Sequence, residues 1–183
     1  ISDDLTGADK IEPILSSIMI RRMVLDVAAD LPEKVVIPQP ISMSEKEALR
    51  YEDFRNEAIG AGEKVGLGAL QKLRMYCTHP QLCDESLAND PYISSIKYQR
   101  MCEIFSEIID RNEKVILFTS YKKMFDILEK DIPNRFGIPV SKINGFTPVE
   151  ERQSIVDDFN SYEGCMLLVL NPRAAGTGLN ITS

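Results

Sequence analysis

The stretch Leu167-Leu-Val-Leu-Asn-Pro-Arg-Ala-Ala-Gly-Thr-Gly-Leu-Asn180 decides the fold that this sequence predicts. The uncharged apolar run from Cys165 to Leu170 is typical of a strand buried on both faces, because parallel strands covered by helices need no polar alternation. The small residues of 174–178 would let backbone N–H groups approach a phosphate closely. Open α/β sheets bind ligands at the carboxyl ends of such strands, so we expect a binding loop here.

Strands and helices alternate regularly ahead of this stretch. We expect strands at Val115–Phe118 and Val140–Ile143, with a helix at Lys122–Lys130 between them. The run Thr147-Pro148-Val-Glu150 supplies an N-cap, a proline at the first helical position and a capping-box glutamate, which predicts a helix to about Asn160. Strand, helix, strand, helix, strand at this spacing predicts a parallel sheet with right-handed crossovers.

The first part of the chain is mainly helical by its apolar periodicity. The patterns predict helices at 11–29, from the capping box Ser44-Glu-Lys-Glu47 through Ala58, at 67–76 and at 95–111. Glycines at 60–68 predict a linker, and the polar segment 84–94 predicts a loop. Two prolines limit Val35–Ile41 to an edge strand or an extended crossover.

Composition limits the function classes. The chain has 183 residues, enough for one sizeable domain or two small ones, and a formal net charge of −7. That charge argues against nonspecific affinity for nucleic acid over the whole surface, so a polyanion site would have to be a local basic patch. No membrane span or signal-peptide pattern is present, and a chain that begins at Ile1 and stops just after a motif looks like an excised fragment.

The cysteines predict a reducing environment. Four scattered cysteines in apolar patterns favour free thiols and a cytoplasmic protein. Cys77, His79 and Cys83 have some metal-site character, but their spacing lacks a paired second knuckle, so we do not expect zinc. His79 precedes a proline and has no nucleophile or carboxylate beside it, which favours a structural hydrogen-bonding role.

Several blocks together resemble one family. Three blocks resemble motifs of the second RecA-like lobe of superfamily-two helicases. They are Lys114–Ser120, Ile143–Thr147 with Glu151-Arg152, and Arg173–Thr182. Four segments resemble, more narrowly, the Swi/Snf-type DNA translocases, including their bacterial members. They are Ile20–Arg22, Leu31–Lys34, Leu73–Pro80 and the glycine-asparagine ending. Five pieces in the right order make the resemblance fairly specific.

The resemblance implies an α/β fold with a RecA-like (P-loop NTPase-type) parallel sheet flanked by helices. It also implies an N-terminal connecting segment, a brace helix and linker at 1–34, before a helicase C-terminal lobe at 35–183 that is truncated before the family's final motif. The intact protein would be an ATP-driven helicase or translocase that uses ATP and Mg, binds DNA and shares its ATP site with a first RecA-like lobe.

The resemblance also implies roles for particular residues. Phosphates of the tracked strand would be held by Thr119, Ser120, Asn171, Arg173, Ala174, Gly176 and Thr177, since hydroxyls, an arginine and bare amides bind backbone without reading bases. Gly178 and Asn180 would face the nucleotide. Arg21 and Arg22 would lie in the brace helix between the lobes or be simply solvent-exposed, and Arg152 matches the arginine of a helix motif or makes an ion pair.

Missing motifs decide what we expect of this chain alone. Phosphoryl transfer needs a phosphate cradle, a magnesium ligand and a positive charge at the γ-phosphate. The sequence has no Walker lysine, no acidic metal-binding motif after a strand and no arginine-finger motif. We therefore predict no catalytic residue, no metal site, no tightly bound cofactor, no ATP hydrolysis and weak DNA binding for the chain by itself.

Other functions remain open at this level. An RNA helicase lobe of the same superfamily would carry similar motifs, and a lobe that survives as a scaffold or DNA clamp would not need ATPase function. A Rossmann-type dinucleotide enzyme is disfavoured, because Gly176 and Gly178 lack the third glycine and the following helix.

Overall fold

The computed structural model describes residues 18–19, 35–60, 67–84, 86–87, 90–174 and 179–182. The chain divides into two compact units, Ile1–Gln39 and Pro40–Ser183. Every described helix and strand belongs to the second unit. Nearly all of the helix predicted at 11–29, including Arg21 and Arg22, lies outside the described residues. Residues 35–44 have no regular secondary structure, so the predicted edge strand at 35–41 is not formed.

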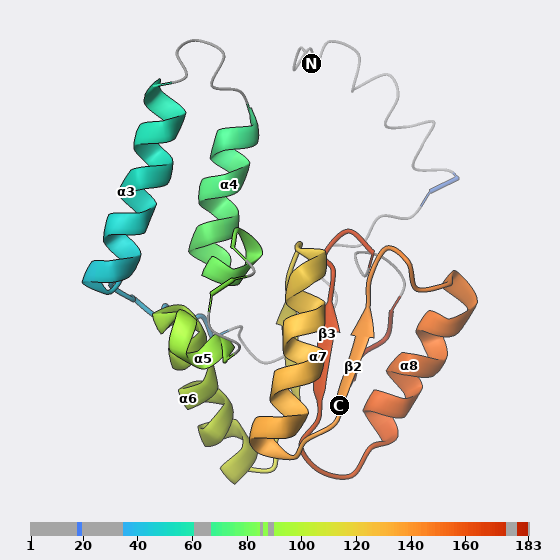
Figure 1. The fold of residues 1–183 in the computed structure, drawn as a ribbon. Coiled ribbons are helices and arrows are strands. Elements are labelled where there is room, and N and C mark those ends of the chain that lie inside the picture. The colour runs from blue at the N-terminus through green and yellow to red at the C-terminus, as the bar shows by residue number, and fades with distance from the viewer. Residues whose placement is uncertain are drawn as a thin grey trace. The chain divides into compact units, whose positions relative to one another are not determined.

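The sheet contains three parallel strands, which are β1 (Val115–Phe118), β2 (Val140–Ile143) and β3 (Leu167–Leu170). Their order is β1-β3-β2, so the last strand in sequence lies in the centre (Figure 1). The bounds of β1 and β2 agree with the prediction. Because all three strands run the same way, their carboxyl ends meet at one edge of the sheet.

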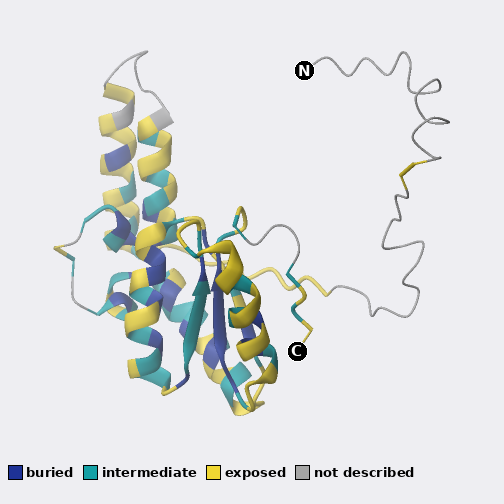
Figure 2. Ribbon diagram, turned by 90° about the vertical axis from the view of Figure 1, so that its right-hand side faces the viewer, coloured by how far each residue is buried: buried dark blue, intermediate teal, exposed yellow. Residues whose placement is uncertain are grey.

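The central strand explains why the apolar run has no polar alternation. Leu167 and Val169 pack into the cluster beneath α6 and α7, whereas Leu168 and Leu170 pack into the cluster beneath α8. All four side chains are buried, and β3 is the dark strand inside the sheet in Figure 2. The double burial of β3 is therefore confirmed.

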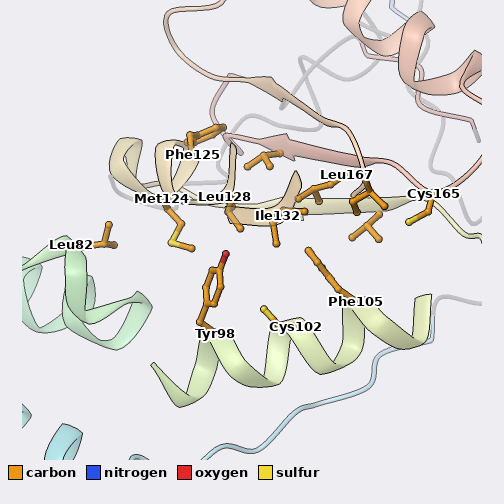
Figure 3. Packing of buried hydrophobic residues seen from close by; sticks show 13 residues of the cluster. Leu82, Tyr98, Cys102, Phe105, Met124, Phe125, Leu128, Ile132, Cys165 and Leu167 are labelled. Carbon is orange, nitrogen blue, oxygen red and sulfur yellow. The ribbon is translucent and has the colours of Figure 1, made fainter. Parts of the chain in front are cut away.

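Two helices cover the first face of the sheet. The helix α6 (Ile96–Asp110) directs Tyr98, Cys102 and Phe105 toward α7 (Lys122–Phe136) (Figure 3). The α7 helix runs six residues beyond the predicted end at Lys130, because Ile132 is fully buried in the core and Gly137 ends the helix in a left-handed conformation with φ of 70°.

The second face is covered by α8 (Val149–Ser161), through Val156 and Phe159. The predicted cap of this helix is wrong in detail. Pro148 occupies the N-cap position without a side-chain cap bond, and the Thr147 hydroxyl instead accepts a hydrogen bond from the Asn144 N–H at 3.1 Å. Thr147 therefore shapes the loop before the helix.

A helical hairpin precedes the sheet. It consists of α3 (Glu45–Gly60) and α4 (Leu67–Thr78), and the reciprocal bonds between Ser44 and Glu47 confirm the predicted capping box. The Glu47 carboxylate also accepts a hydrogen bond from the Ile96 N–H at 3.1 Å, and its backbone carbonyl accepts one from the Tyr76 hydroxyl. The first bond attaches the hairpin to the start of α6, and the second joins the two helices of the hairpin.

Two short elements lie between the hairpin and α6, which are the 3-10 turn η2 (Pro80–Leu82) and the helix α5 (Pro91–Ser94). The sequence predicted only a loop at 84–94, but Asp90 caps α5 by accepting a hydrogen bond from the Tyr92 N–H at 2.9 Å. His79 is fully buried, accepts from the Gln81 N–H and bonds the Pro91 carbonyl at 3.1 Å. Its structural role is confirmed.

Candidate nucleic-acid interface

The loops that follow the three strands form one continuous edge. We call residues 119–123, 144–149 and 171–174 the carboxyl rim. The Thr119 N–H donates to the Leu170 carbonyl at 3.0 Å, and the Asn171 N–H donates to the Ile143 carbonyl at 2.9 Å. These bonds continue the sheet pairing beyond the strands. They bring the candidate residues after β1 and after β3 side by side, as the sequence predicted.

The two hydroxyl residues after β1 differ in exposure. Thr119 is only 8% exposed, and its hydroxyl accepts a hydrogen bond from the Tyr121 N–H at 3.4 Å. Ser120 is exposed. The Thr119 hydroxyl therefore helps to form the turn into α7, while the Ser120 hydroxyl faces solvent where a ligand could reach it.

The loop after β3 uses its own amides. The Asn171 side-chain oxygen accepts a hydrogen bond from the Arg173 N–H at 2.9 Å, and the Asn171 carbonyl accepts one from the Ala174 N–H at 3.0 Å. The Ala174 amide, which the sequence predicted to be bare, is thus engaged within the turn, and so is the Arg173 amide. Arg173 is exposed to solvent, while Gly176, Thr177 and Gly178 lie outside the described residues.

Arg152 joins two loops of the rim. From the first turns of α8, its Nε and Nη2 donate to the Thr147 carbonyl, at 3.2 and 3.1 Å, and its Nη1 donates to the Ala174 carbonyl at 2.8 Å. Within the part of the chain that the structure describes, Arg152 has no carboxylate partner. The ion-pair alternative is therefore not realised among these residues, and Arg152 clamps the β2–α8 loop to the loop after β3.

Asn180 lies away from the carboxyl rim. The Asn160 side-chain amide donates to the Asn180 carbonyl at 3.0 Å, and its side-chain oxygen accepts from the Thr182 N–H at 3.3 Å. Asn160 is eight residues beyond Arg152 on α8, so the two anchoring points are about 12 Å apart along the helix axis. The structure therefore does not bring Asn180 together with Ser120 and Arg173.

Sequence reasoning missed three residues of this region. Lys122 is the first residue of α7, and its ammonium lies 4.6 Å from the ring centre of the exposed Phe146. Lys122 comes directly after the candidate hydroxyls, so the rule that selected Thr119 and Ser120 could also have found it. Phe146 and the anchoring Asn160 carry no comparable sequence signal.

Two charged residues in the second half of α7 belong to a paired network. Arg135 donates to both oxygens of Asp131 at 2.9 Å and to Asp90 at 2.6 Å. The Tyr98 hydroxyl also donates to Asp131 at 2.9 Å, and burial, followed by this hydrogen bond, raises the Tyr98 pKa. We call these four residues the Arg135 network.

The described residues offer no metal site and no membrane segment. They contain no group of three His, Cys, Asp or Glu side chains that could hold a metal ion. No helix among them is both long and apolar enough to cross a membrane. Burial raises the pKa of the Cys102 thiol to about 11, so this cysteine stays protonated near neutral pH.

Comparison with known proteins agrees with the fold. The family described as "Helicase conserved C-terminal domain" matches residues 96–183. The protein YwqA of Bacillus subtilis (strain 168) is 29% identical over 185 residues, which cover 95% of this chain and 20% of YwqA. The mouse protein named "SWI/SNF-related matrix-associated actin-dependent regulator of chromatin subfamily A member 1" is 27% identical over 96% of this chain and 18% of its own length.

Solved structures show the same arrangement. The C-terminal domain of the Sulfolobus solfataricus SWI2/SNF2 ATPase superposes with a TM-score of 0.67 at 26% identity, over 77% of this chain and 64% of that one. The core of the same ATPase in complex with dsDNA gives a TM-score of 0.69 at 24% identity, over 99% of this chain and 40% of that one.

The fold and the matched domain define a RecA-like helicase C-terminal lobe. Within that class, the chain is similar to the Swi/Snf-type ATP-dependent helicases and translocases. It spans about a fifth of the length of the curated relatives it matches.

Proposed function

We propose that this chain is the second motor lobe of an ATP-dependent, Swi/Snf-like DNA translocase or helicase. In the intact protein it would contact the nucleic-acid backbone through the carboxyl rim and complete an ATP site with a first RecA-like lobe of the same polypeptide. The first lobe would supply the phosphate cradle and the magnesium ligands, and bound ATP would supply the energy for lobe closure.

One observation carries the proposal. Ser120 and Arg173 come from loops after two neighbouring strands and are both exposed, and Arg152 holds the loop that carries Arg173 against the β2–α8 loop. A hydroxyl and guanidinium groups bind phosphates without reading bases, which suits a protein that moves along DNA of any sequence. The relatives named above are consistent with this use.

The nucleotide-side residues form a separate part of the proposal. Gly178 and Asn180 are assigned to the ATP site that this lobe would share, and the Asn180 side chain is exposed while its backbone is held by Asn160. Asn180→Ala keeps that backbone bond. We expect it to raise the KM for ATP in the intact protein while leaving the affinity for DNA unchanged.

Steady-state ATP hydrolysis by the intact protein tests the motor function. We expect duplex DNA to stimulate the rate, and Arg173→Ala to require about tenfold more DNA for half-maximal stimulation, because one charge-assisted phosphate contact is lost. Arg111→Ala is the matched control, since Arg111 is exposed at the end of α6, before β1 begins.

The same assay separates the alternatives. Stimulation by RNA but not by duplex DNA would assign the lobe to an RNA helicase. Absence of hydrolysis in the intact protein, with DNA binding retained, would assign it to a scaffold or DNA clamp.

A further inference from the structure

Lys122 and Phe146 form a cation–aromatic pair at the carboxyl rim. They come from different parts of the chain. Lys122 is the first residue of α7, after β1, and Phe146 lies in the loop between β2 and α8. The Lys122 ammonium lies 4.6 Å from the ring centre, yet Phe146 is 76% exposed. Val149, three residues further on, is 74% exposed, so the apolar surface is not confined to one side chain.

The β2–α8 loop has a fixed shape that holds Phe146 outward. The Phe146 N–H donates to the Asn144 side-chain oxygen at 2.9 Å, and the Asn144 N–H donates to the Thr147 hydroxyl at 3.1 Å. Arg152 holds the Thr147 carbonyl on the following side. Single exposed apolar residues are common on protein surfaces, but this ring is pre-positioned beside a cation by bonds on both sides of it.

The charge of the rim differs from that of the whole chain. Residues 119–123, 144–149 and 171–174 contain Lys122, Lys123 and Arg173 and no aspartate or glutamate, although the formal net charge of the chain is −7. The first acidic residues beyond them are Glu150 and Glu151, which are exposed at the start of α8. The rim is thus a local basic patch to which a polyanion is attracted.

We propose that Lys122 and Phe146 form a second contact point for the DNA strand, beside Ser120 and Arg173. The Lys122 ammonium binds a phosphate, and the Phe146 ring packs against the sugar next to that phosphate. A sugar is the partner that fits a duplex, because the bases of a duplex remain stacked inside it. Cations interleaved with aromatic rings are typical of surfaces that follow a nucleic-acid backbone. This contact rests on the proposed function and extends it.

Binding of a fluorescent duplex to the intact protein over a salt series tests both residues. Lys122→Ala is expected to make the negative slope of log K against log salt shallower by about 0.9, since one phosphate contact is lost. Phe146→Ala is expected to weaken binding about fivefold at every salt concentration without changing the slope, because the ring contact releases no counterions. Phe146→Tyr keeps the ring and should bind as the wild type does.

Matched controls lie on the helical hairpin. Lys46→Ala removes an exposed lysine from α3, and Leu70→Ala removes an exposed apolar side chain from α4; neither should change affinity or slope. A purely structural role of the Lys122–Phe146 pair would lower the thermal midpoint of unfolding without the salt signature, and that result would overturn the proposal.

Other outcomes separate this contact from the proposed function. If Arg173→Ala weakens binding while Lys122→Ala and Phe146→Ala do not, the second contact point is wrong and the motor function stands. If duplex DNA neither binds to nor stimulates the wild-type protein, the motor function itself fails. A Phe146→Ala defect confined to single-stranded DNA, or to turnover at saturating DNA, would overturn the sugar contact, because it would assign the ring to an unpaired base or to a protein surface.

Discussion

Two arginines, Arg135 on α7 and Arg152 on α8, are both partly buried but have opposite surroundings. Arg135 is paired with the carboxylates of Asp131 and Asp90, and its guanidinium also lies 4.9 Å from the centre of the Tyr92 ring. Arg152 donates all its observed hydrogen bonds to neutral carbonyls, those of Thr147 and Ala174. Among the residues that the structure describes, carboxylates therefore compensate the positive charge of Arg135 but not that of Arg152.

The difference separates a structural charge from one available to a ligand. Around Arg135 the two carboxylates outweigh the guanidinium, so this region has no electrostatic need of an anion. Around Arg152 the positive charge adds to that of Arg173 and Lys122 on the same rim. Carbonyl partners fix the position of the Arg152 guanidinium without compensating its charge.

The largest expected effect comes from breaking the Arg135 network. Arg135→Ala leaves Asp131, whose side chain is 14% exposed, with only the Tyr98 hydroxyl as a partner. We expect the free energy of unfolding to fall by about 2 kcal/mol, measured by urea denaturation. The double variant with Asp131→Asn should lose less than the sum of the single variants, and additive losses would show that the pair is not coupled.

Arg152→Lys should have a smaller effect on stability and a clear one on function. Lysine keeps the charge, but its single ammonium cannot bond the Thr147 and Ala174 carbonyls in the same fork geometry. We expect a loss of about 1 kcal/mol in urea denaturation, together with weaker stimulation of ATP hydrolysis by DNA in the intact protein. Wild-type behaviour in both measurements would show that charge alone matters at this position and that the clamp does not.

The pH dependence of stability reports on the side of the molecule that holds the Arg135 network. Burial lowers the pKa of His79, an effect partly opposed by its bond to the Pro91 carbonyl, and its ring packs edge-on against Tyr98. The unfolded chain therefore binds a proton near pH 6.5 that the folded chain does not, so stability is full above that pH and falls as the pH drops toward the folded pKa.

Urea denaturation between pH 8 and about pH 5.5 measures this effect, because carboxylates titrate lower. The sequence has one histidine, so His79→Asn should remove the slope across this range even though it lowers the overall stability. A slope that persists in the variant would mean that another group is responsible. The DNA affinity of the rim should not follow the His79 titration.

The smallest expected effect on stability is that of Arg173→Ala. The side chain is exposed, and the turn around it is made by backbone and Asn171 groups that the substitution leaves intact. We expect the free energy of unfolding to change by no more than about 0.5 kcal/mol. A larger loss would show that Arg173 is a structural residue, and the contrast between a structural and a ligand-facing arginine would then not extend to it.

Local signals in the sequence predicted much of the fold. The strand β3 was recognisable because burial on both faces requires four consecutive apolar residues, and Ser44 and Glu47 were recognisable because a capping box lies within four positions. The end of α7 and the helix α5 were missed. Ile132 extends α7 because of what it packs against, and α5 depends on Asp90, whose carboxylate also pairs with Arg135, 45 residues away.

The candidate site divides in the same way. Thr119, Ser120 and Arg173 were found because each follows a predicted strand, and parallel strands bring their carboxyl ends together. The turn in which Asn171 engages the Arg173 and Ala174 amides was not recognisable, and the Arg152 clamp depends on contacts across the rim. The pairing of Lys122 with Phe146 depends on two segments that are distant in sequence.

By itself, the sequence determined the parallel α/β class and the strand positions, and it indicated the family and the loops to be tested for phosphate contact, because these follow from residue types at short spacing. Only the tertiary structure decided that β3 lies between β1 and β2, that Asn180 is anchored away from the rim, and which arginine is paired with carboxylates. Those features depend on which distant groups meet, because a guanidinium charge is compensated by a carboxylate, or left uncompensated beside a carbonyl, only once the chain has brought the groups together.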